Sequence, residues 1–333
     1  MNAVPESPAP RPSTGPPHLP PQIPPKRSRP PELVYVTGSH RSGGTILGVL
    51  LSAHPEIFFP GELNRFPVPA WDPGRLCSCG APLRECALWS KVVGNFADGN
   101  SLVEMRRGQV RFELWRSMPV ALVSQLVRTR PLRKHVTQMA ELLEEIARQT
   151  GKRVIVDASR DAVRGRVASM LETRGFRVRY LHIVRDGRSY LWAETYRPDG
   201  TVGGTRTWRH APMVLAARWV ATNLFPLLLC YGGSRRYLRI RFEDLTTRPA
   251  EVLARIGGFL DLDMSDVIAK VTAQEPLPIV HVLGGSRFRF QGTTTLRREA
   301  GTPDRLTAGA RATFWVVAGW LAGFFGYRVR ESK

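Results

Sequence analysis

A glycine-rich turn between an apolar run and a helical segment constrains the fold of this chain more than any other feature. Residues 33–37 are apolar, β-branched or aromatic, which predicts a buried parallel strand, and residues 45–53 predict a helix. The glycines between them let the backbone fold back, so that N–H groups at the helix start point into one hollow. The sequence therefore predicts a phosphate-binding loop in an α/β fold.

The turn, GSHRSGGT, matches the phosphate-loop pattern G-x-x-x-x-G-K-[ST] only in part. Gly38, Gly43 and Thr45 occupy its fixed places, but Gly44 stands where the pattern has lysine. Without that lysine an ATP-hydrolysing enzyme would lack its main cation, and Arg41 supplies a cation inside the loop instead. A nucleotide kinase or ATPase is therefore kept as an alternative only.

The rest of the chain alternates between strands and helices, which predicts a central parallel sheet flanked by helices. Further strands are predicted at residues 153–156, 178–184 and 237–241. Helices are predicted at residues 102–128, 133–150, 162–174, 188–196, 211–229, 249–260 and 308–325. Residues 276–304 are expected to be irregular and basic.

Two regions depart from this alternation. Residues 1–31 are rich in proline and nearly without large apolar side chains, so we expect a disordered tail, for which the sequence identifies no partner. Residues 32–330 are predicted to form one domain, in which residues 102–150 are a helical insertion.

The charge of the chain narrows its partners. A net charge of +20 favours an anionic partner, but the arginines are scattered and no zinc-finger or RNA-recognition signature accompanies them, so we expect no nucleic-acid partner.

The longest apolar runs, residues 224–230 and 314–327, fall short of the roughly 20 residues of a membrane span. We expect both to be buried helices, although the second also fits peripheral membrane contact. No secretory signal is visible, so we expect a cytoplasmic protein, whose oligomeric state the sequence does not indicate.

Several segments follow one another in a specific order. They are GSHRSGGTIL, LLSAHPEIFFPGELNRF, VIVDASRDAVR, YLHIVRDGRSYLWAETYR, AARWVATN, IRFEDLTTRPAEVLARIGGFLDLD and GGSRFRF. Together, over residues 33–327, they resemble the sulfotransferase family, particularly its carbohydrate and tyrosylprotein-type branches. The resemblance implies a P-loop-like sulfotransferase fold and an enzyme that transfers a sulfuryl group from 3′-phosphoadenosine 5′-phosphosulfate (PAPS) to an acceptor hydroxyl.

The resemblance gives the loop a role in binding the donor. Arg41 would stabilise the negative charge that develops on the departing 5′-phosphate, assisted by the backbone N–H groups of Ser42, Gly43 and Gly44 and by the Thr45 hydroxyl. Because this phosphate is already a good leaving group, no metal is required.

The resemblance also implies a general base. Glu62 lies where the similar enzymes carry a catalytic glutamate, and Gly61 before it suits a tight turn into a cleft. We rank Glu56 second, and we expect His54 to be structural.

The 3′-phosphate of the donor needs its own cation. Arg185 matches the family's arginine, but Ala193 stands where the family has a serine, so Ser189 or Arg188 would have to substitute. Arg287 lies in a segment similar to the one that closes over the nucleotide. Ala193 also keeps open a non-catalytic nucleotide-binding protein.

The acceptor is not determined by the sequence. Arg160 follows a predicted strand and is a candidate contact for the sulfate, and Trp208, in a predicted loop, is a candidate contact for a sugar ring. A carbohydrate, a tyrosyl peptide, a lipid and a small metabolite all remain possible acceptors.

Three cysteines lie close together in the pattern C-x-C-G-x-P-x-x-x-C, at Cys77, Cys79 and Cys86. Three thiolates bind zinc when a fourth ligand comes from elsewhere, but the spacing is not that of a zinc ribbon or finger. A local disulfide and plain thiols are the other interpretations, and we predict no metal ligands.

Overall fold

The computed structural model describes residues 31–68, 72, 74–96, 100–195, 211–231, 233, 235–298 and 306–329. The predicted tail, apart from Pro31, and the segment that contains Trp208 lie outside the described residues.

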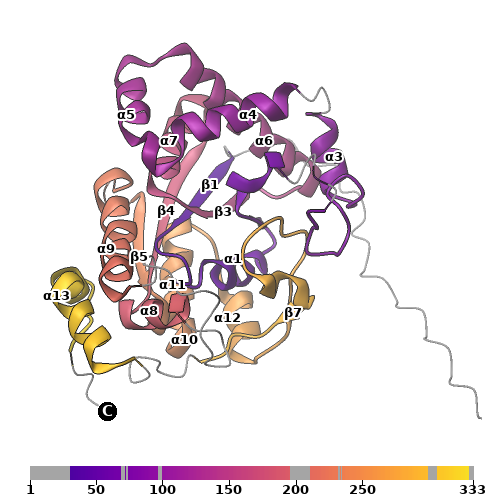
Figure 1. The fold of residues 1–333 in the computed structure, drawn as a ribbon. Coiled ribbons are helices and arrows are strands. Elements are labelled where there is room, and N and C mark those ends of the chain that lie inside the picture. The colour runs from indigo at the N-terminus through magenta and orange to yellow at the C-terminus, as the bar shows by residue number, and fades with distance from the viewer. Residues whose placement is uncertain are drawn as a thin grey trace, which may run out of the picture.

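A five-stranded sheet forms the centre of the molecule (Figure 1). All its strands are parallel, in the order β2-β3-β1-β4-β5, which confirms the predicted parallel sheet. The strands are β1 (Glu32–Thr37), β2 (Ile57–Gly61), β3 (Val154–Arg160), β4 (Arg177–Val184) and β5 (Tyr237–Arg241). β2 is an additional strand that the sequence analysis did not predict. It contains Pro60, whose missing backbone donor is tolerated because β2 lies at the edge of the sheet.

Helices cover both faces of the sheet, as the apolar residues on both sides of β1 require. Leu33 and Tyr35 pack under one layer, whereas Val34 and Val36 pack under the other. The first layer holds α3 (Trp89–Gly94), α4 (Asn100–Phe112), α5 (Met118–Val127), α6 (Arg130–Thr150) and α7 (Ala162–Ala168). The second holds α1 (Gly44–Ser52), α11 (Pro249–Leu260) and α12 (Ser265–Thr272).

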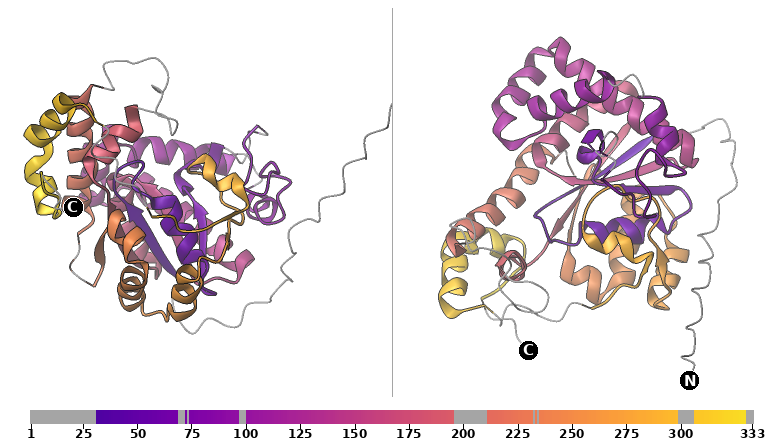
Figure 2. Two further views of the ribbon diagram at one scale, coloured as in Figure 1. Left: turned by 90° about the horizontal axis from the view of Figure 1, so that it is seen from below. Right: turned by 45° about the vertical axis from the view of Figure 1, so that its right-hand side comes forward.

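A third cluster lies at the β4–β5 side of the sheet, where α13 packs beside α9 (Figures 1 and 2). It joins α8 (Gly187–Thr195), α9 (Pro212–Leu229) and α13 (Ala308–Phe324). By length and composition, α9 is apolar enough to cross a membrane. Trp219 and Phe314 are buried between α9 and α13, but Leu228 and Trp320 on the same helices are exposed. One side of α9 and one side of α13 are therefore buried, as expected, and the other side of each is exposed. Peripheral membrane contact stays a prediction.

Two expected helices are interrupted. Residues 102–128 divide into α4, the short 3-10 turn η2 (Trp115–Ser117) and α5, because Leu114 is extended and Pro119 starts a new helix. Residues 162–174 divide into α7 and the 3-10 segment η3 (Ser169–Arg174). The segment expected to be irregular contains a small antiparallel pair, β6 (Leu277–Pro278) with β7 (Thr293–Thr294), and the 3-10 turn η5 (Arg287–Gln291).

Candidate active site

The predicted site residues follow the carboxyl ends of the strands, which meet at one edge because every strand is parallel. The glycine-rich loop follows β1, Glu62 follows β2, and Arg160 ends β3. Arg185 follows β4, and Phe242 opens α10 (Phe242–Thr247) directly after β5. Residues that are more than 200 positions apart in the chain therefore share one edge of the sheet.

Two glycines of the loop are required by their surroundings. Gly38 and Gly43 have left-handed backbones, with φ of 129° and 93°. A Cβ atom on Gly38 would lie 2.3 Å from the carbonyl oxygen of Ile183, and one on Gly43 would lie 2.3 Å from the Phe242 ring. Ser42 closes the turn by donating its hydroxyl to the Ser39 carbonyl at 2.7 Å. The loop therefore needs glycine at both positions for its backbone path into α1.

Glu62 is buried and held by two arginines. Arg65 Nε donates to Glu62 Oε2 at 2.6 Å, and Arg160 donates to Glu62 Oε1. Arg160 has a left-handed backbone with φ of 68°, and its side chain runs past Gly44, whose added Cβ would lie 3.7 Å from Arg160 Cδ. Arg160 therefore links the glycine-rich loop to Glu62.

A second pair of glycines packs over Glu62. A Cβ on Gly284 would lie 3.3 Å from Glu62 Cβ. A Cβ on Gly285 would lie 3.1 Å from Thr45 Oγ1 and 3.9 Å from Glu62 Oε1. The Thr45 hydroxyl and the Glu62 carboxylate thus both approach the same glycine.

A buried ionic network fixes the segment that follows Glu62. Asp157 Oδ1 accepts the backbone N–H of Leu63 at 3.1 Å, and its Oδ2 pairs with Arg164 at 3.0 Å. Arg164 also pairs with Glu113 at 2.5 Å, and Glu113 lies 2.7 Å from His135 Nε2. Burial opposes ionisation of Glu113, but Arg164 and His135 outweigh it and lower the pKa of this carboxyl to about 2.

Arg185 is held from both sides at the end of β4. It donates to the Arg41 carbonyl at 2.6 Å, and its guanidinium lies 5.1 Å from the centre of the Phe242 ring. Its own carbonyl accepts Trp219 Nε1 at 3.0 Å. Burial lowers the pKa of Arg185, although its charge is retained at neutral pH.

Arg41 lies at the exposed mouth of the loop. Its side chain is 60% exposed, and its Nε lies 3.6 Å from Glu194 Oε1 on α8. Arg218 on α9 lies 3.9 Å from the other oxygen of Glu194. Arg41 is part of the glycine-rich loop, but its side chain is exposed to solvent.

The remaining candidates differ in their positions. Ser189 is buried on α8. Arg188 is also buried, and its guanidinium forms an ion pair with the Asp186 carboxylate at 2.6 Å. Arg287 is exposed on η5, whereas Arg289 on the same turn donates to the Gly285 carbonyl at 3.2 Å. Trp208 lies outside the described residues.

Four groups at this edge were not predicted. Arg65 and Glu194 form ion pairs that no motif signals, and Gly285 is recognisable only once its neighbours are known. His40 stands inside the loop motif, which gave it no role. His40 is exposed, and desolvation followed by repulsion from Arg160 lowers its pKa.

The three neighbouring cysteines do not stand alone in space. Cys77, Cys79 and Cys86 meet His281, from the loop that also carries Gly284 and Gly285. All the described cysteines are free thiols in the structure.

The comparisons with known proteins decide the family. Residues 31–266 match the model of the sulfotransferase family. The chain belongs to this family. Family membership makes it a transferase of the sulfuryl-transfer class, whereas the donor, the base and the acceptor stay predictions. No curated protein sequence matches the chain.

Three solved structures are similar to this chain to different degrees. The sulfotransferase domain of the olefin synthase of Synechococcus PCC 7002 is 19% identical, with a TM-score of 0.51, over 92% of this chain and 98% of that one. The sulfotransferase domain from the curacin biosynthetic pathway is 19% identical with a TM-score of 0.46, over 91% and 100% of the two chains. Mouse sulfotransferase SULT7A1 complexed with PAP is 12% identical with a TM-score of 0.45, over 86% and 82%. At 19% identity, the likeness to the first of these concerns the fold alone.

Proposed function

We propose that this sulfotransferase takes the sulfuryl group from PAPS and transfers it to an acceptor hydroxyl, with Glu62 as the general base. The supporting observation is the convergence of Thr45 and Glu62 on Gly285, with Arg160 running between the loop and the carboxylate. The glycine-rich loop and a buried carboxylate are thus adjacent at the carboxyl edge of the sheet.

The loop would bind the 5′-phosphosulfate end of the donor. The N–H groups at the start of α1 and the Thr45 hydroxyl are donors for its oxygens, and the helix dipole adds favourable charge. Arg185 would carry the 3′-phosphate, because its guanidinium is fixed by the Arg41 carbonyl and the Phe242 ring. Arg287, being exposed, would need to turn toward the nucleotide when it binds.

The reaction would exchange one sulfur–oxygen bond for another. The acceptor oxygen forms a bond to sulfur while the bond from sulfur to the 5′-phosphate oxygen breaks, and Glu62 takes the acceptor's proton. Each carboxylate oxygen has two lone pairs, so the contacts to Arg65 and Arg160 leave capacity for the hydroxyl. Arg41 and the loop N–H groups would stabilise the charge left on the 5′-phosphate.

Calorimetric titration with 3′-phosphoadenosine 5′-phosphate (PAP), beside ATP with Mg²⁺, tests the donor site. We expect PAP to be preferred, and we expect Arg185→Ala and Arg41→Ala to weaken its binding about 10-fold or more, as for losing a hydrogen bond between charged groups. Arg148→Ala, at an exposed arginine of α6, is the matched control. Preference for ATP, or unchanged PAP affinity in both variants, would refute the donor assignment; tight PAP binding without turnover of PAPS would refute catalysis but leave a nucleotide-binding protein.

A further inference from the structure

A tight hairpin gathers the three cysteines. The N–H of Cys77 donates to the Ala81 carbonyl at 2.9 Å, and the N–H of Gly80 donates back to the Cys77 carbonyl at 2.9 Å. Gly80 has φ of 87°, which is why a glycine follows Cys79 at this turn. The N–H of Cys86 then donates to the Pro82 carbonyl at 2.9 Å and returns the chain to the hairpin. The C-x-C-G-x-P-x-x-x-C pattern thus specifies one compact turn.

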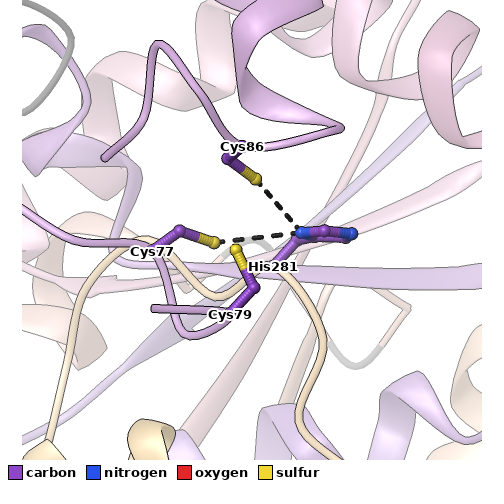
Figure 3. Close-up of side chains that lie close together, drawn as sticks. All are labelled: Cys77, Cys79, Cys86 and His281. Carbon is purple, nitrogen blue, oxygen red and sulfur yellow. Dashed lines mark hydrogen bonds between the residues drawn. The ribbon is translucent and has the colours of Figure 1, made fainter. Parts of the chain in front are cut away.

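A fourth side chain arrives from a distant segment. His281 lies 204 residues after Cys77, and its Nδ1 is 3.2 Å from Cys86 Sγ and 3.9 Å from Cys77 Sγ. The three sulfurs and the imidazole nitrogen all lie within 4.8 Å of one another, and Figure 3 shows them facing a common centre. His281 has a left-handed backbone with φ of 55°, and its carbonyl accepts Trp89 Nε1 at 2.8 Å. The fold therefore holds the histidine in an unfavourable backbone conformation beside the cysteines.

These separations are close to those of a tetrahedral zinc centre. Bond lengths of about 2.3 Å to sulfur and 2.0–2.1 Å to nitrogen place ligand atoms roughly 3.5–3.8 Å apart. The distances of 3.2 and 3.9 Å from His281 bracket this range. We propose that Cys77, Cys79, Cys86 and His281 bind one zinc ion. Because four protein ligands complete the tetrahedron, the centre is structural and has no open position for a substrate.

The surroundings suit three thiolates. A backbone amide lies in hydrogen-bond contact with each sulfur: that of Cys79 with Cys77, that of Ala81 with Cys79, and that of Trp89 with Cys86. Such contacts orient the ligands and disperse their charge. Three thiolates and one Zn²⁺ leave a net charge of −1, and the Arg289 guanidinium lies close enough to Cys77 to interact with it electrostatically.

The site joins the hairpin to the loop over Glu62. Directly after His281, the N–H of Val282 donates to Ser78 Oγ at 2.9 Å, and the N–H of Leu283 donates to the Pro60 carbonyl at 2.7 Å. Gly284 and Gly285 then pack on Glu62. Zinc would therefore fasten the glycine pair in place from one side. This consequence rests on the proposed function, whereas the metal site itself does not.

Metal analysis of the full chain, purified from cells supplied with zinc, tests the site. We expect one zinc per chain, lost in Cys86→Ser and in His281→Ala and retained in Cys230→Ser. Cys230 is the matched control, because it is equally buried but donates to the Ala162 carbonyl on another part of the fold. Wild-type protein without metal, or zinc retained in both ligand variants, would overturn the proposal. A mass lower by one pair of hydrogen atoms, showing a disulfide within the hairpin, would also overturn it.

X-ray absorption at the zinc edge of the wild-type protein keeps the test independent of how the variants fold. We expect a shell of three sulfurs at about 2.3 Å and one nitrogen at about 2.0 Å. A shell of light atoms only, or of four sulfurs, would contradict the ligand set. The two proposals can fail separately. The zinc content and the absorption shell decide the metal site whatever the PAP affinity, whereas loss of PAP binding by the zinc-loaded chain in Arg185→Ala is required for the function.

Discussion

The two sides of the candidate active site hold their charged groups differently. On the Glu62 side, the carboxylate is buried between Arg160 and Arg65, and the chain after it is fixed by Asp157, which pairs with Arg164 in the core. On the Arg41 side, the guanidinium is 60% exposed and meets Glu194 at 3.6 Å.

This difference indicates a division of work. A base must be placed before the acceptor arrives, because a small displacement from the reacting proton costs much of its effect. A donor with several negative charges can instead draw exposed arginines into place as it binds, since surface pairs such as Arg41–Glu194 are weak. We therefore expect substitutions on the Glu62 side to affect stability and turnover, and substitutions on the Arg41 side to affect donor affinity as well as turnover, but not stability.

The largest effect should come from breaking the buried network at Arg164. Arg164→Met leaves the Glu113 and Asp157 carboxylates buried without their cation, and we expect the free energy of unfolding to fall by about 3–5 kcal/mol. Urea unfolding measures it. Lys134→Met is the control, because its pair with Glu104 is exposed at both partners, and we expect little or no change there. Equal effects of the two variants would remove the contrast between buried and exposed pairs.

The next largest effect concerns Glu62 itself. Glu62→Gln keeps the size of the side chain but cannot accept the proton, so we expect turnover to fall about 10²-fold or more while PAP affinity changes little. Glu56→Gln is the matched control, since Glu56 pairs with Arg153 at 2.7 Å before β2, away from the glycine-rich loop. Normal turnover in Glu62→Gln together with reduced turnover in Glu56→Gln would mean that Glu56, and not Glu62, is the general base.

The sequence predicted the parallel sheet and the loop after β1, because both depend on local patterns: a run of apolar β-branched residues and glycines in fixed places. It also placed Arg160 and Arg185 at strand ends, from which a parallel sheet brings them to one edge. The residue contacts were not predictable in this way. His281 joins the cysteines, and Gly285 reaches Thr45, over more than 190 residues of chain, and nothing in either local sequence indicates the other. β2 is a similar case. A proline within a strand is acceptable only at the edge of a sheet, and the local sequence around Pro60 does not show that β2 lies there.

The stability of the protein should depend on pH through two buried groups, His182 and Glu113. Next to Gly38 of the glycine-rich loop, His182 on β4 is buried between Tyr237 and Asn223, and desolvation lowers its pKa from 6.5 to about 3. The unfolded chain therefore binds a proton that the folded chain excludes. Above pH 6.5, His182 is neutral in both states and does not change the free energy of unfolding. Below pH 6.5, protonation of the unfolded chain lowers the free energy of unfolding by up to about 1.4 kcal/mol per pH unit, until the pH reaches about 3.

For Glu113 on the other side, with its pKa lowered from 4.5 to about 2, the loss begins only below pH 4.5. We therefore expect the free energy of unfolding to decline between pH 6.5 and 5, and we expect His182→Gln to decline less steeply over this range. The difference between the two slopes separates His182 from the other histidines. Parallel curves for the two proteins would mean that His182 does not titrate in this way.

The smallest effect should be seen at Glu194. If Arg41 must leave Glu194 to reach the donor, Glu194→Gln removes a competitor and a repulsive charge, and PAP affinity should rise by up to about fivefold, the value of an exposed ion pair. The gain should shrink as salt screens the pair. Glu172→Gln, which breaks the Arg236 pair away from the strand ends that carry the site, should leave PAP affinity unchanged. Weaker binding in Glu194→Gln would reverse the interpretation: Glu194 would then position Arg41 for the donor, and the Arg41 side would be as pre-organised as the Glu62 side.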